Sequence, residues 1–183
     1  EWTSFAALLA AAKANPGKLR YTTAGVGSSP HLAGADLWQK AGVQLVDVPY
    51  PGDVAAVPHL LAGDVELGVY TTFTIATQKL RPLAVFAAER TKRYPDVPTV
   101  TELGYRVLPS GYGGLFVRSG TPDAIVARLE AACRDAANDP AFTDLVEKQY
   151  QQLAYTDRAA FTARIEADYR AKGVLLPTLK LPE

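Results

Sequence analysis

Residues 19–31 bring together a strand-like run, a turn that contains two glycines, and the beginning of a helix-like run. Gly25 and Gly27 allow the backbone to fold tightly and to direct several N–H groups toward one point. Apolar side chains recur at helical spacing after Pro30, up to about residue 41. This succession of strand, turn and helix predicts an α/β fold in which the turn follows a sheet strand.

The turn has the features of an anion seat. Ser29 is a good N-cap and Pro30 suits the first helical position, so the free N–H groups there would face an anion at the positive end of the helix dipole. No Lys or Arg lies between Thr22 and Lys40, so backbone amides and hydroxyls would have to hold such an anion. The alternative is a purely structural turn, because the stretch is neither a Walker loop nor a complete dinucleotide fingerprint.

Strand and helix patterns alternate with short connections over the first 90 residues, which predicts a largely parallel sheet covered on both faces. The helices expected there are 3–14, 30–41, 53–61 with Asp53 as N-cap, and 71–78, and the strands are 19–23, 43–48, 65–70 and 80–87. The pattern then changes, with a glycine-bearing strand at 110–117 as the crossing between two lobes. Further helices are expected from about 121, over 140–149 and from about 156.

Composition excludes several classes of protein. The 183 residues carry no net charge, which argues against a nucleic acid or a membrane surface as partner. No apolar run approaches the roughly 20 residues that span a bilayer, and no signal peptide is recognisable in the chain. Two histidines and one cysteine form no convincing metal cluster, and no cofactor is indicated. Cys133 follows Ile125 and Leu129 at helical spacing, which predicts a thiol in the core.

The search for catalytic motifs is negative, since the sequence has no nucleophile elbow and no zinc-protease motif. Ser28 or Ser29 with His31 would be the residues of a hydrolase, if the chain were an enzyme. His31 is expected in the first helical turn, where it either donates a hydrogen bond to a ligand or satisfies a backbone carbonyl.

Three loops are expected at the carboxyl ends of the strands, where ligands bind in open α/β sheets. They are residues 22–31, 49–53 and 70–74. Their hydroxyls, amides and two tyrosines suit a small polar or carboxylated molecule with an apolar body.

Several runs, in this order, resemble the solute-binding receptors of tripartite tricarboxylate transporters, also called the Bug family. They are residues 14–19, 24–34, 48–52, 60–67, 80–85, 95–100, 112–116 and 120–122. The resemblance implies a two-lobed periplasmic receptor of the type II binding-protein fold that closes on an organic carboxylate and performs no catalysis. It implies membrane transporter subunits as partners and no nucleic acid.

In this family, the loop that matches residues 23–31 grips a carboxylate through amides and hydroxyls. Together with the three-loop argument, this gives the expected ligand-binding residues: Thr23, Ala24, Gly25, Gly27, Ser28, Ser29, His31, Tyr50, Tyr70 and Thr71. The family often has an acid soon after the strand that matches residues 67–70, whereas this chain continues with Thr71, Thr72 and Phe73.

The resemblance also predicts the domain organisation. Residues 1–105 would form the ligand-binding α/β lobe, the second lobe of the family, and residues 106–183 would return to an incomplete first lobe. The chain begins where the family's second lobe begins, so it is expected to be a fragment or a reduced relative. The missing segment, or another chain, would complete the first lobe. The alternative function is a sensory or interaction module that keeps the fold and presents ligand to a signalling partner.

Overall fold

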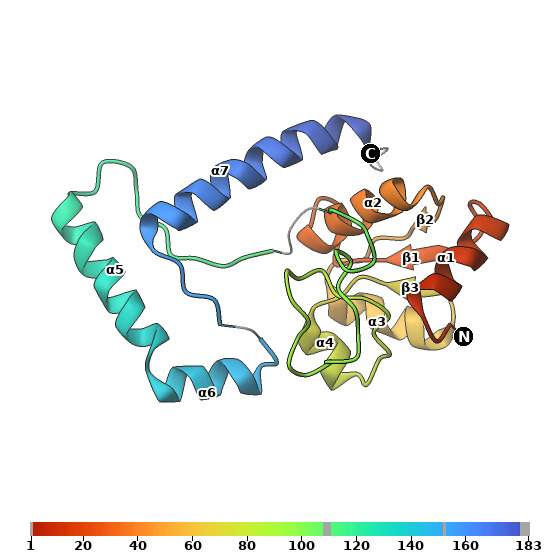
Figure 1. Cartoon of the computed structure of the whole chain (residues 1–183), viewed down its shortest axis with the longest axis horizontal. Coiled ribbons are helices and arrows are strands. Elements are labelled where there is room, and N and C mark those ends of the chain that lie inside the picture. Colours follow the sequence, from red (N-terminus) through yellow and green to blue (C-terminus); the bar gives the residue numbers. More distant parts are fainter. Residues whose placement is uncertain (1, 108–110, 152, 180–183) are drawn as a thin grey trace. The chain divides into compact units, whose positions relative to one another are not determined.

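The computed structural model describes residues 2–107, 111–151 and 153–179 of the chain (Figure 1). Its helices are, in order, α1 Phe5–Ala14, α2 Ser29–Ala41, α3 Asp53–Ala62, α4 Thr72–Thr77, α5 Asp123–Ala137, α6 Pro140–Lys148 and α7 Arg158–Leu175, followed by the 3₁₀ turn Leu176–Thr178. Its strands are β1 Arg20–Thr22, β2 Val46–Asp47 and β3 Leu67–Gly68. No helix in these described ranges is long and apolar enough to cross a membrane.

Two compact units make up the structure. The described residues up to Gly111, together with those from Lys172 onward, form the first unit, and Tyr112–Ala171 form the second. The division of the chain into receptor lobes at residues 105 and 106 stays a prediction.

The sheet of the first unit is parallel, with the strand order β2-β1-β3. Tyr21 pairs with Asp47 on one side of β1 and with Leu67 on the other. The chain moves one way along the sheet from β1 to β2 and the opposite way from β2 to β3, and right-handed crossovers then place α2 and α3 on opposite faces. Figure 1 shows α2 above and α3 below the strands. The predicted α/β fold with a parallel sheet is confirmed.

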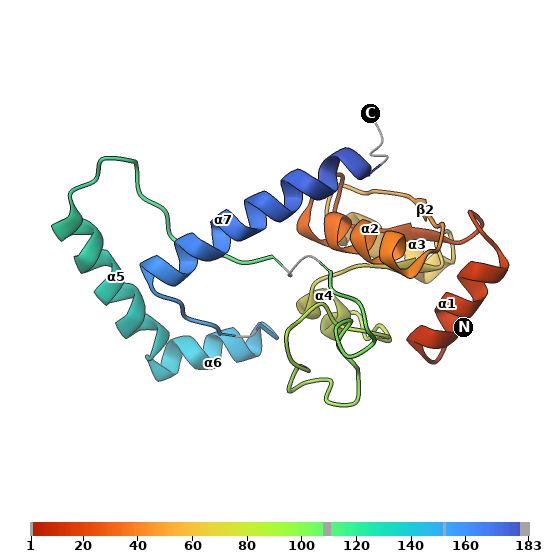
Figure 2. The same cartoon turned by 45° about the horizontal axis from the view of Figure 1, so that its top comes forward.

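The core of this unit joins α1, β1 and α2, which Figure 2 shows from a second side. The Trp38 ring of α2 lies 6.4 Å from Phe5 of α1 and 5.8 Å from Tyr21 of β1, measured between ring centroids. Burial of such side chains contributes about 1.5–3 kcal/mol each. The buried residues of this cluster are Phe5, Leu8, Ala12, Tyr21, Leu37, Trp38, Ala41, Val43, Val69 and Val100.

Two predicted strands are absent from the described chain. Residues 80–87 form only an isolated parallel bridge, between Val85 and Thr99, because Pro82 offers no N–H to a ladder. Residues 111–117 contain no strand, and Ser110 lies outside the described residues. The three glycines of that stretch weaken a strand, and Leu115 and Phe116 are exposed.

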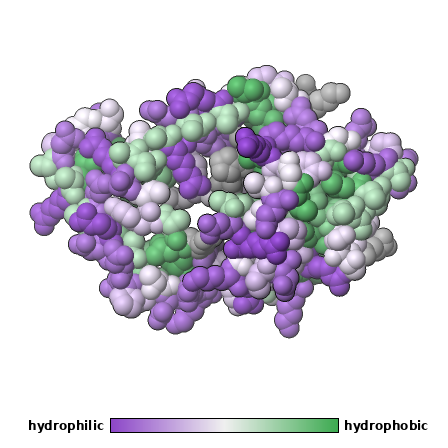
Figure 3. Space-filling view, in the orientation of Figure 1, coloured by the Kyte–Doolittle hydropathy of each residue, from purple (hydrophilic) through white to green (hydrophobic). Residues whose placement is uncertain are grey.

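The second unit contains α5, α6 and most of α7. Ile125 and Leu129 are about half exposed and Cys133 is only partly buried, so the predicted core position of this stripe is wrong. Tyr169 is 80% exposed, and Figure 3 shows apolar side chains among polar ones on the surface. Helical spacing indicates an apolar face but does not supply the element that covers it.

Gly34 allows α2 to approach the sheet closely. A Cβ at this position would lie 3.2 Å from Val69 Cγ2 and 3.5 Å from Tyr21 Cε2. We expect Gly34→Leu to lower the free energy of unfolding by about 1–3 kcal/mol, because the core must move to admit the side chain.

Gly173→Leu is the matched control, since a Cβ at this helical glycine meets nothing within 4 Å. We expect no loss there and a gain of up to about 1 kcal/mol from helix propensity. Both tryptophans, Trp2 and Trp38, lie in the first unit, so denaturant unfolding followed by tryptophan fluorescence reports on it. An equal loss in the two variants would contradict the close approach.

Candidate functional site

The loops that follow the three strands meet at the carboxyl edge of the sheet. The Tyr50 N–H after β2 donates to the carbonyl of Thr23 after β1 at 3.3 Å. Because α2 and α3 leave this edge toward opposite faces, the boundary between β1 and β3 is a topological switch point, and such switch points are where ligands bind in open α/β sheets.

The loop from Thr23 to Ser28 depends on two glycines. Gly25 has φ +120° and Gly27 has φ +75°, a region that other residues rarely adopt. A Cβ at Gly25 would also lie 3.4 Å from the Tyr50 carbonyl oxygen. Gly25 therefore provides both the turn and the contact with the neighbouring loop.

Ser28, rather than Ser29, caps helix α2. The Ser28 Oγ accepts a hydrogen bond from the His31 N–H at 3.3 Å, and its carbonyl accepts the Leu32 N–H at 3.0 Å. Ser29 is the first helical residue, and its hydroxyl faces the backbone of Gly111, where a Cβ would lie 3.2 Å from Oγ. The predicted cap was therefore wrong by one residue. Two adjacent serines have the same capping chemistry, and only the backbone of Ser28, at ψ 157°, decides between them.

Two amides expected to face an anion are bonded inside the loop. The Gly27 N–H donates to His31 Nδ1 at 3.0 Å, and the Ser28 N–H donates to the Gly25 carbonyl at 3.2 Å. By contrast, the N–H groups of Gly25, Val26 and Ser29 have no acceptor among the described residues. The amides open to an anion therefore differ in part from the predicted ones.

His31 is 2% exposed and uses both ring nitrogens inside the protein. Its Nδ1 accepts from Gly27, and its Nε2 lies 2.8 Å from Asp47 Oδ2. Neither sequence-based alternative, a ligand contact or a backbone carbonyl, describes this arrangement. No pattern of neighbouring residues points to Asp47, because its contact with His31 depends on the pairing of β1 with β2.

The two tyrosines are each held by a neighbour. The Tyr50 ring stacks on His59 of α3 with 4.3 Å between centroids. The Tyr70 ring covers Gly68, where a Cβ would lie 2.2 Å from Tyr70 Cε2. Burial, and next the charge of Asp53, raises the pKa of the Tyr70 phenol, so the group stays a neutral hydroxyl.

Asp53 fixes the third loop. Its Oδ2 accepts hydrogen bonds from the Thr71 N–H at 3.3 Å, the Thr71 hydroxyl at 3.2 Å and the Thr74 hydroxyl at 2.6 Å. The N-cap of α3 is Gly52, so the predicted capping role of Asp53 is wrong. Thr71 caps α4, and its polar groups are engaged within the protein rather than left open.

Buried hydroxyls without hydrogen-bond partners lie at the ends of β1 and β3. Thr22 and Thr23 are fully buried, and neither Oγ1 forms a hydrogen bond with a described residue. The Tyr70 hydroxyl is also buried and forms no hydrogen bond with a described residue. The nearby Thr22 hydroxyl opposes the rise in the pKa of Tyr70. Because buried polar groups are nearly always satisfied, this edge has unused capacity for a ligand or water.

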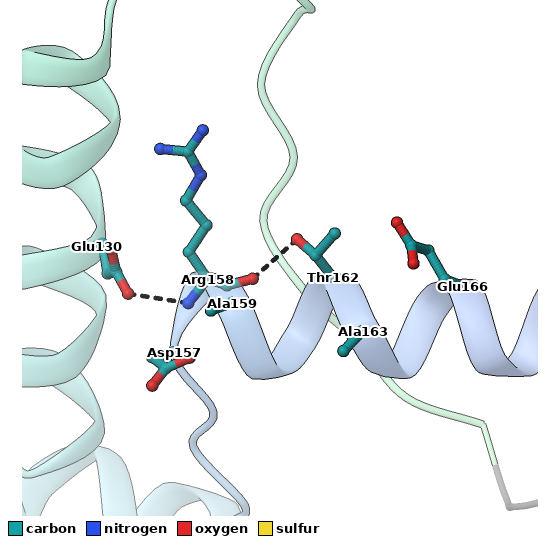
Figure 4. A pocket seen from close by; sticks show the side chains of 7 residues that line it. All are labelled: Glu130, Asp157, Arg158, Ala159, Thr162, Ala163 and Glu166. Atoms are coloured by element: carbon teal, nitrogen blue, oxygen red, sulfur yellow. Dashed lines mark hydrogen bonds between the residues drawn. The ribbon is translucent and has the colours of Figure 1, made fainter.

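A hollow of about 670 Å³ lies in the second unit, between α5 and the start of α7 (Figure 4). Its charged lining consists of Glu130, Asp157, Glu166 and Arg158. The Glu130 carboxylate accepts the Arg158 N–H at 2.8 Å, and the Arg158 guanidinium pairs with Asp123. Three carboxylates against one guanidinium make this hollow unsuited to an organic acid.

No group of three or more His, Cys, Asp or Glu side chains is placed to hold a metal ion in the part of the chain that the structure describes.

The capping assignment is testable. We expect Ser28→Ala to lower the free energy of unfolding of the first unit by about 1 kcal/mol, because the His31 N–H loses its acceptor. Ser29→Ala should change it by less than about 0.5 kcal/mol. Denaturant unfolding followed by tryptophan fluorescence measures both. A larger loss for Ser29→Ala would restore the cap predicted from the sequence.

Comparison with known proteins agrees with this architecture. The family model described as "Tripartite tricarboxylate transporter family receptor" matches residues 3–180. A "UPF0065 protein in tcbD-tcbE intergenic region" from Pseudomonas sp. (strain P51) is 39% identical over 148 residues, which cover 76% of this chain and 43% of the relative. The chain thus spans under half the length of this curated relative.

Two solved structures have the same fold. The crystal structure of a TctC solute-binding protein from Polaromonas, without ligand, is 30% identical with a TM-score of 0.83, covering 97% of this chain and 62% of that one. R. palustris Rpa4515 with adipate is 23% identical with a TM-score of 0.77, covering 98% and 62%. The family consists of receptors rather than enzymes, so the hydrolase hypothesis is abandoned. The family model matches nearly the whole chain, and the parallel sheet is consistent with that match. This chain therefore belongs to the tripartite tricarboxylate transporter family receptors.

Proposed function

We propose that this chain is part of a periplasmic receptor and binds a small organic carboxylate for a tripartite tricarboxylate-type transporter. Membership of the receptor family supports the receptor role. The adipate in the R. palustris structure of the same fold supports a dicarboxylate as the ligand class. The membrane subunits of the transporter are the partners that this function requires.

The observation that carries the proposal is the set of open amides between β1 and α2. The N–H groups of Gly25, Val26 and Ser29 have no acceptor in the described chain, and residues 24–30 are partly or fully exposed. Ser29 also lies at the positive end of the α2 dipole, which favours an anion. A ligand carboxylate would supply the acceptors that these amides lack.

The buried Thr23 hydroxyl adds a second, independent feature. It lies directly after β1, where the loop begins, and it has no hydrogen-bond partner among the described residues. A hydroxyl can donate to a carboxylate oxygen without adding charge. The proposed contacts are therefore Thr23, Ala24, Gly25, Val26 and Ser29, and Tyr50 and Tyr70 would line the site.

Of the two acids at this edge, Asp53 is engaged by hydrogen-bond donors, so it opposes an anionic ligand less than a free carboxylate would. Asp53 accepts three hydrogen bonds through one oxygen. Asp47 lies against His31 at 2.8 Å. The hydrogen bonds to Asp53 stabilise its carboxylate locally, whereas burial raises the pKa of Asp47 and its oxygens form no aligned hydrogen bond with a described residue.

Calorimetric titration tests the proposal directly. We expect the full chain to release or absorb binding heat with adipate and not with adipamide, which has the same length but no charge. The difference follows from the stronger hydrogen bonds that amides make to an ionised acceptor. Absence of heat with adipate and with shorter dicarboxylates would refute the proposal for this chain.

Gly27→Val tests the role of the loop. A valine is disfavoured at φ +75°, by about 1–2 kcal/mol, so the loop should change conformation and adipate should bind about tenfold more weakly.

Gly17→Val is the matched control, because Gly17 has φ +69° and equally open surroundings in the turn between α1 and β1. We expect a similar loss of stability but unchanged affinity for adipate. Equal affinities in the two variants would remove the loop from the site.

A further inference from the structure

His31 is connected to the loop before it at two points. Its ring Nδ1 accepts the Gly27 N–H at 3.0 Å, and its own backbone N–H donates to Ser28 Oγ at 3.3 Å. The side chain is 2% exposed, so water does not compete for these bonds. A change in the ring position would therefore be transmitted to the peptide of Gly27.

The two ring contacts define one tautomer. Nδ1 accepts a hydrogen bond and is unprotonated, so the proton of the neutral ring lies on Nε2. Nε2 lies 2.8 Å from Asp47 Oδ2 on β2, so the ring nitrogen that carries the proton is next to a carboxylate, although the two do not form an aligned hydrogen bond. The imidazole thus stands between a backbone donor on one side and a carboxylate on the other.

Asp47 is held in place by the sheet. It pairs with Tyr21 in the β1–β2 ladder, and its side chain is 16% exposed. Burial raises the pKa of this carboxyl, and the contact with His31 opposes the rise. The sheet thereby fixes Asp47, Asp47 orients the ring of His31, and the ring fixes the Gly27 peptide.

This geometry points to His31 and Asp47 as a positioning pair that sets the conformation of the carboxylate-binding loop without touching the ligand. The inference rests on the proposed function for its consequence but not for its geometry. With the Gly27 amide turned to the ring and the Ser28 amide turned to Gly25, the amides of Gly25, Val26 and Ser29 are among those left for an acceptor. His31 is accordingly removed from the set of direct ligand contacts.

Nuclear magnetic resonance of the ¹⁵N-labelled full chain tests the geometry without a ligand. We expect an unprotonated Nδ1, a protonated Nε2, and a scalar coupling across the hydrogen bond between the Gly27 nitrogen and His31 Nδ1. Saturation with adipate should leave this tautomer and this coupling unchanged. A protonated Nδ1, or loss of the coupling when adipate binds, would overturn the inference.

Two variants separate the roles of the ring nitrogens. In His31→Asn, the side-chain oxygen lies near the position of Nδ1 and can accept from Gly27, but the side chain is too short to contact Asp47. In His31→Gln, the longer side chain can contact Asp47, but it has no acceptor near the position of Nδ1 for the Gly27 N–H. We expect His31→Gln to bind adipate about tenfold or more weakly, because it leaves the Gly27 N–H without its partner. We expect His31→Asn to have an intermediate affinity, because it keeps an acceptor for Gly27 but loses the contact by which Asp47 orients the side chain.

The outcomes distinguish this inference from the proposed function. If the wild-type chain binds adipate and both variants bind it equally well, the receptor role stands and the positioning role fails. If the wild-type chain binds no dicarboxylate, the proposed receptor role fails, and so does the effect of His31 and Asp47 on ligand affinity. The nuclear magnetic resonance signals of the His31 ring would still show whether the ring accepts a hydrogen bond from Gly27. Because those signals come from the wild-type protein, misfolding of a variant does not prevent the decision.

Discussion

The parallel pairing of β1 with both of its neighbours determines where everything else at the candidate site can lie. Because the chain leaves β1 and β2 in opposite directions along the sheet, α2 and α3 cover opposite faces and the carboxyl ends of β1 and β3 form a topological switch point. The loop at residues 23–28, the buried hydroxyls and the Tyr70 ring are all at this edge. Gly34 belongs to the same arrangement, since it allows α2 to lie close against Tyr21 and Val69.

The loop combines internal bonds with open donors, and the two are connected. The Gly27 and Ser28 amides are used to hold the loop, and the amides of Gly25, Val26 and Ser29 remain open. A loop fixed in this way loses little conformational entropy when a ligand binds, which favours affinity without formal positive charge.

The predictions failed where a pattern needed a partner that lies far away in the sequence. Apolar spacing in α5 indicated a packed stripe, yet Ile125 and Leu129 are exposed in a unit that covers them little. In the expected strand at 80–87, only Val85 forms a bridge, with Thr99, because Pro82 has no N–H to continue a ladder. Either of the two adjacent serines could cap α2, and Ser29 was predicted, but the extended backbone of Ser28 makes Ser28 the N-cap.

The alternation of elements, the parallel sheet and the glycine-bearing turn after the first strand could be predicted from the amino-acid sequence, and the family from the resemblance of its ordered runs. Local patterns suffice for the elements and the turn, because glycine at positive φ and helical or strand spacing are properties of neighbouring residues. The folded chain was needed to show which amides stay open and that the His31 ring contacts Gly27 and Asp47. These outcomes depend on strand register, which brings Asp47 beside a helix that begins 18 residues earlier in the chain.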